Sequence, residues 1–249
     1  MIEYKKIIVN NVQISYCYTH NNNRRLVIML HGFGSNKDEK GNYGVLSEKL
    51  LENSFDSLRF DYPGHGESSG SSEDLTIDYG IQIIEELLKL YNYDEINFVG
   101  ASYGGGLAAI YSWNHFVNKM VLWSPLLDSY HNVIEPENHF CKEFLGNEAL
   151  EQINKNGYAT FGVDGVRFNM NVFDDAKKYP CAIKEKMNVK GILLLHGKKD
   201  LLVPYSQSLR VANINDSIEL LLFEDGTHCF YDDSIDEVIN KTVKYLKGD

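Results

Sequence analysis

The sequence predicts an α/β fold built on a mostly parallel, doubly wound sheet, with an antiparallel N-terminal edge and an inserted lid. Three observations lead to this prediction. From residue 26 onward, short apolar runs typical of buried strands alternate with longer segments of helical periodicity. The turn at 100–104 has an apolar run before it and a helical pattern after it, as a crossover in a parallel sheet requires. The alternation breaks only between residues 125 and 187, which indicates an insertion.

The N-terminal edge is predicted from residues 4–18, where apolar side chains alternate on both sides of Asn10-Asn11. This pattern is typical of a two-stranded hairpin. The run at 26–30 is apolar throughout, which indicates a strand buried on both of its faces. Beyond it we expect strands at 54–60, 95–100, 118–123, 190–196 and 218–223, and helices at 43–53, 74–91, 103–113, 204–213 and 233–247.

Residues 125–187 mix aromatic side chains, glycines and charges without a clear strand. A loop of about 63 residues is too long to lack secondary structure inside a compact domain. We therefore predict a lid (cap) at 125–187 that is partly helical near 138–155. It interrupts a core formed by residues 1–124 and 188–249.

Composition argues against several classes of function. With 249 residues, of which 43% are hydrophobic, the chain can bury one large core. A formal net charge of -11 repels phosphate backbones and anionic headgroups, so we expect no nucleic-acid partner. No apolar run reaches the roughly 20 residues of a membrane span, and the N-terminus lacks the apolar core of a signal peptide. We therefore expect a cytoplasmic protein without a membrane span.

The four cysteines are scattered along the chain without the spacing of a zinc site or a disulfide framework. We expect reduced thiols at Cys17, Cys141, Cys181 and Cys229, and we expect no metal and no cofactor. Cys229 stands beside His228, but a small buried side chain is its expected role rather than a nucleophile.

Residues 100–104, Gly-Ala-Ser-Tyr-Gly, are the stretch that predicts a chemistry. A glycine stands two residues to either side of the serine, because a side chain there would collide with the neighbouring strand or helix. Ser102 then projects from the sheet edge as a candidate nucleophile. The helix that follows offers the free N–H of Tyr103 to a developing oxyanion. The arrangement indicates acyl transfer.

A serine nucleophile needs a base and an acid, which in this architecture follow it in the order Asp, His. Asp200 comes just after a buried strand, and His228 comes between the last strand and the last helix. Both positions lie at the carboxyl end of the sheet, the same edge as Ser102. Asp128, which follows an earlier strand, is the alternative candidate for the acid.

The second oxyanion donor is expected in the loop after the strand at 26–30. Gly32 allows the backbone to turn close to the substrate, so the N–H of Phe33 can act together with that of Tyr103. His31 is expected to hold this loop in place rather than to act as a base.

Five motifs, in this order, resemble those of the α/β-hydrolase superfamily: LHGFG at 30–34, DYPGHGES at 61–68, GASYGG at 100–105, HGKKD at 196–200 and GTH at 226–228. They are most similar to its branch of esterases, monoacylglycerol lipases and serine aminopeptidases, which includes feruloyl and cinnamoyl esterases. The resemblance covers nearly the whole chain.

This resemblance implies the α/β-hydrolase fold, a catalytic triad, an oxyanion hole and the lid at 125–187. The triad would consist of Ser102, Asp200 and His228, and the oxyanion hole of Phe33 and Tyr103. The loop at 61–68 would flank the site without a catalytic role. The single glycine in His31-Gly32-Phe33 differs from the HGGG loops of some carboxylesterases, which argues against that branch.

The sequence therefore predicts a serine hydrolase that cleaves carboxylic esters through an acyl-enzyme, without metal or cofactor. The expected substrate is a small-molecule ester with a short or medium acyl chain or an aromatic, hydroxycinnamoyl acid. The aromatic lid would form an apolar slot, and its net acidic charge disfavours acyl-CoA. The aromatic side chains of the lid are Tyr130, Phe140, Phe144, Tyr158, Phe161, Phe168, Phe173 and Tyr179.

Three alternatives are open at this point: an acyl thioesterase with the same triad, an aminopeptidase with the same triad, and a non-catalytic binding protein on the same fold. The aminopeptidase would need lid carboxylates to hold the substrate ammonium. The candidates for that role are Glu135, Glu137, Glu143, Glu148 and Glu151. A homodimer is also left open.

Overall fold

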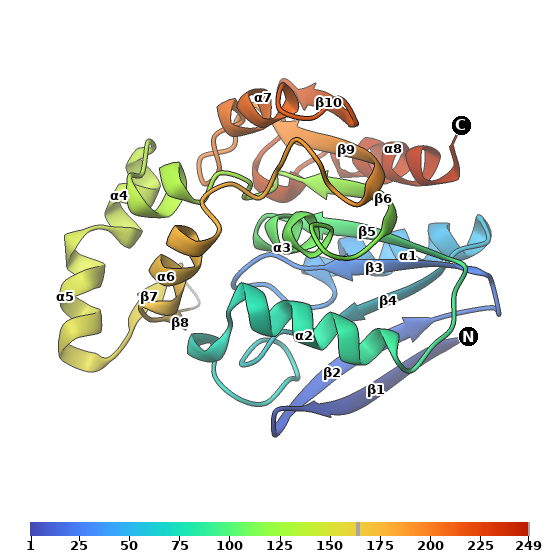
Figure 1. Ribbon diagram of the computed structural model, residues 1–249, viewed down its shortest axis with the longest axis horizontal. Helices are drawn as coiled ribbons and strands as arrows, with labels where there is room; N and C mark the ends of the chain where they lie inside the picture. Colours follow the sequence, from blue (N-terminus) through green and yellow to red (C-terminus); the bar gives the residue numbers. More distant parts are fainter. Residues whose placement is uncertain (163–164, 249) are drawn as a thin grey trace.

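The computed structural model describes residues 1–162 and 165–248, and it is organised around an eight-stranded sheet (Figure 1). The strand order is β1-β2-β4-β3-β5-β6-β9-β10. β2 pairs antiparallel with β1 and with β4, and the remaining neighbours pair parallel. The strands are β1 (Ile2–Val9), β2 (Val12–Thr19), β3 (Arg25–Leu30), β4 (Asp56–Phe60), β5 (Glu95–Ala101), β6 (Val117–Trp123), β9 (Val189–Gly197) and β10 (Ile218–Phe223). The predicted α/β fold with an antiparallel N-terminal edge is confirmed.

Local chemistry explains these strands. Asn10 and Asn11 both have positive φ, at 48° and 64°, the geometry that a tight hairpin turn needs and that asparagine tolerates. In β3, alternate side chains enter two different apolar cores: Leu26 and Ile28 pack on one side of the sheet and Val27 on the other. The uninterrupted apolar run of β3 therefore reflects burial on both faces, as predicted.

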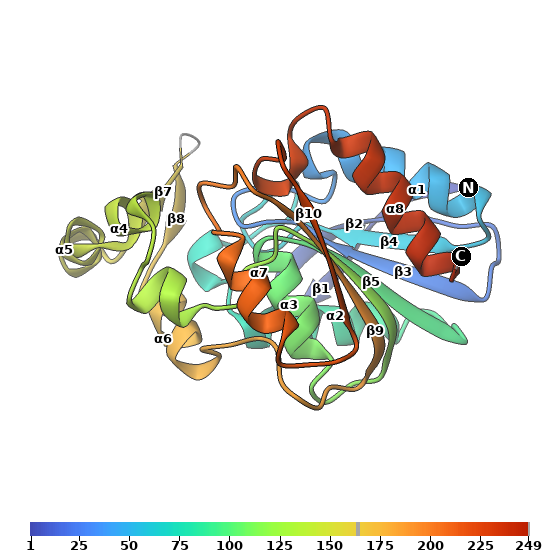
Figure 2. The ribbon, with the colours of Figure 1, turned by 90° about the horizontal axis from the view of Figure 1, so that it is seen from above.

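Helices cover both faces of the sheet (Figure 2). α1 and α8 share one core with one face of the sheet, whereas side chains of α2, α3 and α7 belong to the core on the opposite face. These helices are α1 (Asn42–Glu52), α2 (Ile77–Leu88), α3 (Tyr103–Tyr111), α7 (Ser206–Ala212) and α8 (Ile235–Lys247).

α2 begins later than the sequence pattern predicts. The predicted start at 74 falls in a short 3-10 turn, η2 (Ser72–Asp74). The hydroxyl of Thr76 accepts the N–H of Tyr79 at 3.1 Å and so caps the first turn of α2 at Ile77. Three other 3-10 or π turns interrupt the loops: η1 (Glu39–Gly41), η3 (Tyr130–Ile134) and η4 (His228–Phe230).

Between β6 and β9 the chain forms additional elements, which lie together beyond the end of the sheet (Figures 1 and 2). They are η3, α4 (His139–Leu145), α5 (Asn147–Asn156), β7 (Ala159–Phe161), β8 (Val166–Phe168) and α6 (Asn171–Lys178). They share a small apolar core that includes Ile153, Phe168 and Phe173. The division into a core and a lid stays a prediction. Residues 163–164 of the predicted lid and 249 of the predicted core lie outside the described residues.

Of two expectations for this segment, its partly helical character is confirmed and the absence of a clear strand was wrong. The helical structure near 138–155 consists of two helices, α4 and α5, because the backbone at Gly146 is extended and interrupts the hydrogen-bond ladder. A Cβ at Gly146 would lie 2.3 Å from the carbonyl oxygen of Lys142, so the sharp corner needs glycine. The segment also contains strands, β7 and β8, which pair antiparallel. Each is three residues long, too short to show an alternating pattern.

Candidate active site

Ser102 occupies the sharp turn between β5 and α3, with φ 49° and ψ -114°. Its N–H donates to the carbonyl of Trp123 on the neighbouring strand β6, at 3.0 Å. A positive φ strains a residue that is not glycine, and such strain persists where the surrounding structure fixes it. The flanking glycines are sterically required. A Cβ at Gly100 would lie 2.5 Å from the Gly104 carbonyl oxygen, and one at Gly104 would lie 2.2 Å from that of Leu30.

Asp200 follows β9, and its side chain is fully buried. Its Oδ1 accepts the N–H groups of Leu202 and Val203, both at 2.9 Å. Its Oδ2 lies 2.7 Å from Nδ1 of His228 and 3.3 Å from Nε2 of His196. The two backbone bonds fix the carboxylate, so its second oxygen is held against His228.

His228 lies in the loop after β10 and lines the same cavity as Ser102. A carboxylate can only accept a hydrogen bond, so Nδ1 of His228 carries the proton. Nε2 is then left as the lone-pair nitrogen that a general base uses. Among the described residues, Ser102 Oγ makes no hydrogen bond in this structure. Such a contact often closes only when substrate is bound.

The charge of Asp200 is strongly favoured. Burial by itself would raise its pKa, but the nearby His228 and the hydrogen bonds from His196 and His228 together hold the pKa well below its ordinary value. Asp200 is therefore a carboxylate over the whole range in which proteins are ordinarily assayed.

The loop after β3 places Gly32 directly against Ser102, since a Cβ at Gly32 would lie 3.4 Å from Cβ of Ser102. The carbonyl of Gly32 accepts from Nδ1 of His31 at 2.7 Å and from the N–H of Ser35 at 3.1 Å. In a planar trans peptide the N–H points opposite to the carbonyl. The N–H of Phe33 is therefore directed away from His31 and Ser35.

Tyr103 is the first residue of α3, so its N–H has no acceptor within the helix. In the part of the chain that the structure describes, neither the N–H of Phe33 nor that of Tyr103 has a hydrogen-bond acceptor. Both residues line the cavity beside Ser102. They are the two donors that the sequence predicted for an oxyanion.

Two buried histidines support the Gly32 loop and are not bases. Nε2 of His31 accepts the N–H of Tyr62, and Nε2 of His65 accepts the N–H of Gly34, both at 3.2 Å. Burial lowers the pKa of His31 well below its ordinary value, and burial also lowers the pKa of His65. Both imidazoles are neutral, which agrees with the structural role predicted for His31.

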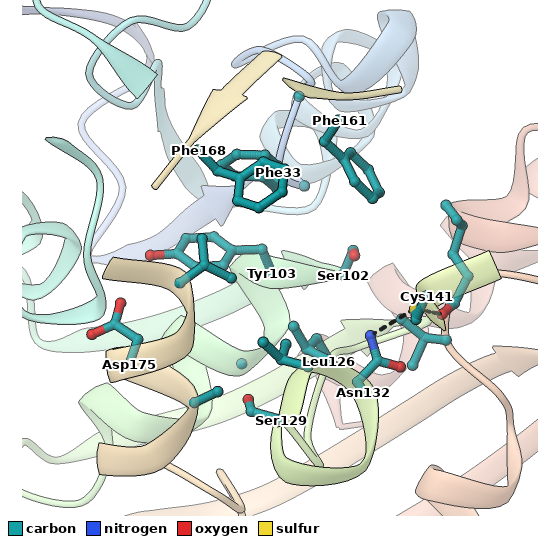
Figure 3. Close-up of a pocket in the computed structure, with 18 of the residues that line it drawn as sticks. Phe33, Ser102, Tyr103, Leu126, Ser129, Asn132, Cys141, Phe161, Phe168 and Asp175 are labelled. Carbon is teal, nitrogen blue, oxygen red and sulfur yellow. Dashed lines mark hydrogen bonds between the residues drawn. The ribbon is translucent and has the colours of Figure 1, made fainter. Parts of the chain in front are cut away.

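A cavity of about 290 Å³ opens in front of Ser102, and its lining is mostly apolar. Figure 3 shows Phe33, Phe161 and Phe168 on one side of this space and Leu126, Ser129 and Asn132 on the other. Of the aromatic side chains of the predicted lid, Phe161, Phe168 and Tyr179 line the cavity. Asp175 of α6 contributes a carboxylate to the lining, and it lies beyond the ring of Tyr103 as seen from Ser102 (Figure 3).

Comparison with known proteins identifies the fold. A family model described as "alpha/beta hydrolase fold" matches residues 25–147. Est1E from Butyrivibrio proteoclasticus, in a structure with ferulic acid bound, superposes with a TM-score of 0.77 at 19% identity, over 97% of both chains. The chain has the α/β-hydrolase fold.

Two curated proteins with sequence similarity to this chain are hydrolases. Proline iminopeptidase of Saccharolobus solfataricus is 31% identical over 128 residues, which is 49% of this chain and 40% of the relative. The chain thus matches less than half the length of that protein. Mouse mitochondrial palmitoyl-protein thioesterase ABHD10 is 27% identical over 85% of this chain and 75% of the relative.

The alternative candidate for the acid, Asp128, is bonded to other side chains. Asp128 accepts from Nδ1 of His131 at 2.9 Å and from the guanidinium of Arg210 at 3.0 Å.

Cys229, next to His228, is buried, and burial raises the pKa of its thiol well above the ordinary value. Cys229 is therefore a neutral, inert thiol. All four cysteines are free.

Sequence reasoning missed two acidic residues near the candidate site. Glu39 is buried behind the Gly32 loop, and Asp175 reaches the cavity from the segment between β6 and β9. Neither stands in a motif, so no local signal distinguishes it from a surface carboxylate.

Within residues 1–162 and 165–248, no group of three or more His, Cys, Asp and Glu side chains is placed to hold a metal ion. The same residues include no helix with the length and apolar character of a membrane span.

Proposed function

We propose that the chain is a serine hydrolase that cleaves carboxylic esters through an acyl-enzyme. Ser102 is the nucleophile, His228 the general base and Asp200 the residue that orients the base. The observation that supports this most strongly is the 2.7 Å hydrogen bond between Asp200 and His228, at the wall of the cavity that Ser102 lines. Burying a carboxylate against a histidine is costly, and a binding protein on this fold would not need it.

In the proposed reaction, Ser102 Oγ attacks the ester carbonyl carbon while Nε2 of His228 takes the hydroxyl proton. The resulting imidazolium gives that proton to the departing alkoxide, which leaves as the alcohol. A water molecule then attacks the acyl-enzyme with His228 again as base, and the acid leaves as Ser102 regains its proton. Asp200 stabilises the imidazolium in both halves and stays ionised.

The N–H groups of Phe33 and Tyr103 are the proposed oxyanion donors. Neither N–H has an acceptor among the described residues, and both residues line the same cavity as Ser102. Donors of this kind stabilise charge that develops only in the transition state, and loss of one typically costs about 10²–10³ in kcat.

For the substrate we propose a neutral ester with a short or medium acyl chain or an aromatic acid. The apolar lining near Ser102 supports this, since Phe161 and Phe168 offer contact area without charge (Figure 3). The ferulic acid bound in Est1E is an aromatic acid held on the same fold.

A thioesterase is the second candidate, and the similarity to palmitoyl-protein thioesterase ABHD10 favours it. The same triad would act, with a thiolate as leaving group. An aminopeptidase is less well supported, although one relative is a proline iminopeptidase. The five glutamates that could hold a substrate ammonium are exposed, and none belongs to the cavity lining: Glu135, Glu137, Glu143, Glu148 and Glu151.

The test is covalent labelling with a fluorophosphonate followed by peptide mass analysis. We expect one adduct, on Ser102, and none on Ser102→Ala. Ser129→Ala, which changes another serine of the cavity lining, is the matched control and should label like the wild type. Folded wild-type protein without an adduct would favour the binding-protein alternative.

Substrate class is tested separately, by kcat/KM on p-nitrophenyl acyl esters, methyl ferulate, monoacylglycerols, acyl-CoA and amino-acid p-nitroanilides. We expect the highest efficiency on a neutral ester. A preference for acyl-CoA or an anilide would overturn the substrate proposal while leaving the assignment of Ser102, Asp200 and His228 intact.

A further inference from the structure

Glu39 is a fully buried carboxylate that joins two loops of the active site. Its Oε2 accepts the N–H of Gly32, in the loop after β3, at 2.9 Å. Its Oε1 accepts the hydroxyl of Tyr231, three residues after His228. One side chain thus connects the loop of the proposed oxyanion donor with the loop of the proposed base.

The backbone on both sides of this connection is strained. Glu39 and Lys40 have φ of 44° and 55°, and Cys229 and Phe230 have φ of 53° and 57°. Residues other than glycine avoid this region, so four of them at one contact indicate that the surrounding bonds hold the backbone there. The Glu39–Tyr231 hydrogen bond lies between the two strained segments.

Burying the Glu39 carboxylate costs free energy that an apolar side chain at the same position would not. Burial raises the pKa of Glu39, and the hydrogen bonds from Tyr231 and Gly32 only partly offset that effect. A buried charge is seldom the most stabilising way to join two loops, since apolar side chains of similar volume often stabilise a fold equally well. Unlike an apolar side chain, Glu39 can accept a hydrogen bond from a backbone N–H.

The Glu39 carboxylate binds next to the peptide group that carries the N–H of Phe33, the proposed oxyanion donor. Glu39 fixes the N–H of Gly32, while His31 and Ser35 fix its carbonyl. With both sides of Gly32 held, the peptide plane between Gly32 and Phe33 has one orientation, and the N–H of Phe33 has one direction. Without Glu39, one of these two restraints is lost.

We propose that Glu39 is a positioning residue, which orients the Phe33 N–H through Gly32 and holds the His228 loop in register with it through Tyr231. This inference rests on the proposed function, because it assumes that Phe33 donates to an oxyanion and that His228 is the base. Glu39 does not line the cavity in front of Ser102, so it acts through Gly32 and Tyr231 rather than on the substrate itself.

Three variants test the role of Glu39 on the best ester of the substrate panel. Glu39→Leu removes the acceptor, and we expect kcat to fall by about 10², the effect of one misdirected oxyanion donor, with KM changed less than threefold. Glu39→Gln keeps an amide oxygen for Gly32 and should restore kcat to within about tenfold of wild type. Tyr231→Phe breaks only the link to the His228 loop, and we expect a loss of about tenfold in kcat. Glu48→Leu, an exposed acid on α1, is the matched control and should leave both constants unchanged.

A boronic acid that forms a tetrahedral adduct on Ser102 tests whether Glu39 positions the oxyanion donor or only stabilises the fold. The quantity to measure is the affinity of each variant for this boronic acid. We expect it to weaken in Glu39→Leu in proportion to the loss of kcat, and to recover in Glu39→Gln. Wild-type kcat in Glu39→Leu would overturn the inference, and so would losses that Glu39→Gln does not restore. If Glu39→Leu does not fold, Tyr231→Phe decides, since unchanged kcat there contradicts the link between the loops. A wild-type protein that fluorophosphonate does not label would instead contradict the proposed function.

Discussion

Nδ1 of His228 lies 2.7 Å from Oδ2 of Asp200, and the backbone N–H groups of Leu202 and Val203 hold the other oxygen of that carboxylate. Asp128, the alternative acid, is instead bonded to His131 and Arg210. The two aspartates follow different strands at the same edge of the sheet, and only one of them is bonded to the candidate base. The sequence offered both aspartates as candidates for the acid, and this hydrogen bond favours Asp200.

Asp200→Asn should therefore be far more damaging than Asp128→Asn. An asparagine at 200 can present its amide nitrogen to His228 and favour the wrong tautomer, so we expect kcat to fall by on the order of 10³–10⁴. Asp128→Asn should cost less than about tenfold, because it changes a charged pair outside the cavity lining. Steady-state kinetics on p-nitrophenyl acetate measure both. The opposite ranking would mean that Asp128 is the acid.

The pH dependence of kcat/KM should show a single ionisation on the acid side. The pKa of Asp200 is held well below its ordinary value, so Asp200 keeps its charge until far below neutral pH. Loss of activity on acidification then belongs to protonation of His228, and kcat/KM should fall tenfold per pH unit. The measurement is a profile from pH 9 to pH 4.5 on a neutral ester. A slope of two would indicate that the reaction also depends on a second ionisation, such as that of Asp175 in the cavity lining, and a flat profile would rule out the base.

The glycines around Ser102 give a prediction on stability. A Cβ at Gly104 would lie 2.2 Å from the backbone oxygen of Leu30, a contact that only a shift of β3 or α3 can relieve. We expect Gly104→Ala to destabilise the protein by about 3 kcal/mol or more and to abolish labelling of Ser102.

Gly44 provides the matched control, because it lies inside α1 and a Cβ there would meet nothing within 4 Å. Gly44→Ala should stabilise the protein by up to about 1 kcal/mol, since alanine is the better helix former. Urea unfolding of the three proteins compares them. Equal effects at the two positions would show that the close packing around Gly104 is not needed.

Much of the fold could be predicted because its signals are local. The apolar run of β3, the Asn10-Asn11 turn and the Gly-flanked Ser102 each depend on neighbours within a few residues. The positions of Asp200 and His228 followed from one further rule, that parallel strands end at the same edge of a sheet. These signals predict the region of the site, although they give no distances.

The features that the sequence did not reveal depend on contacts between distant segments. Glu39 meets Tyr231 across 192 positions of the chain, and no short pattern marks either residue. The strands β7 and β8 are three residues each and depend on their pairing rather than on periodicity. Asp175 is seen to belong to the cavity only when α6 is placed in space.

Asp175 leads to a prediction on how stability varies with pH. Its Oδ2 accepts the N–H of Ile77 at 2.7 Å, yet burial raises its pKa from 3.8 to about 6, and Asp78 adds to that effect. An acid whose pKa is higher in the folded state binds a proton more tightly there, so this carboxyl contributes stability below about pH 4. That contribution is lost as pH rises through 6. Ionised Asp175 therefore destabilises the fold at neutral pH.

Asp175→Asn should consequently raise the melting temperature at pH 7.5 and have little effect at pH 4.5, where the wild-type carboxyl is protonated. The asparagine oxygen can still accept from Ile77, so the hydrogen bond is kept. After allowance for partial exposure, we expect a gain of about 1 kcal/mol at pH 7.5. Glu48→Gln, at an exposed position of α1, is the control and should change the melting temperature alike at both pH values. A shift in melting temperature that is the same for Asp175→Asn at pH 7.5 and pH 4.5 would contradict the raised pKa.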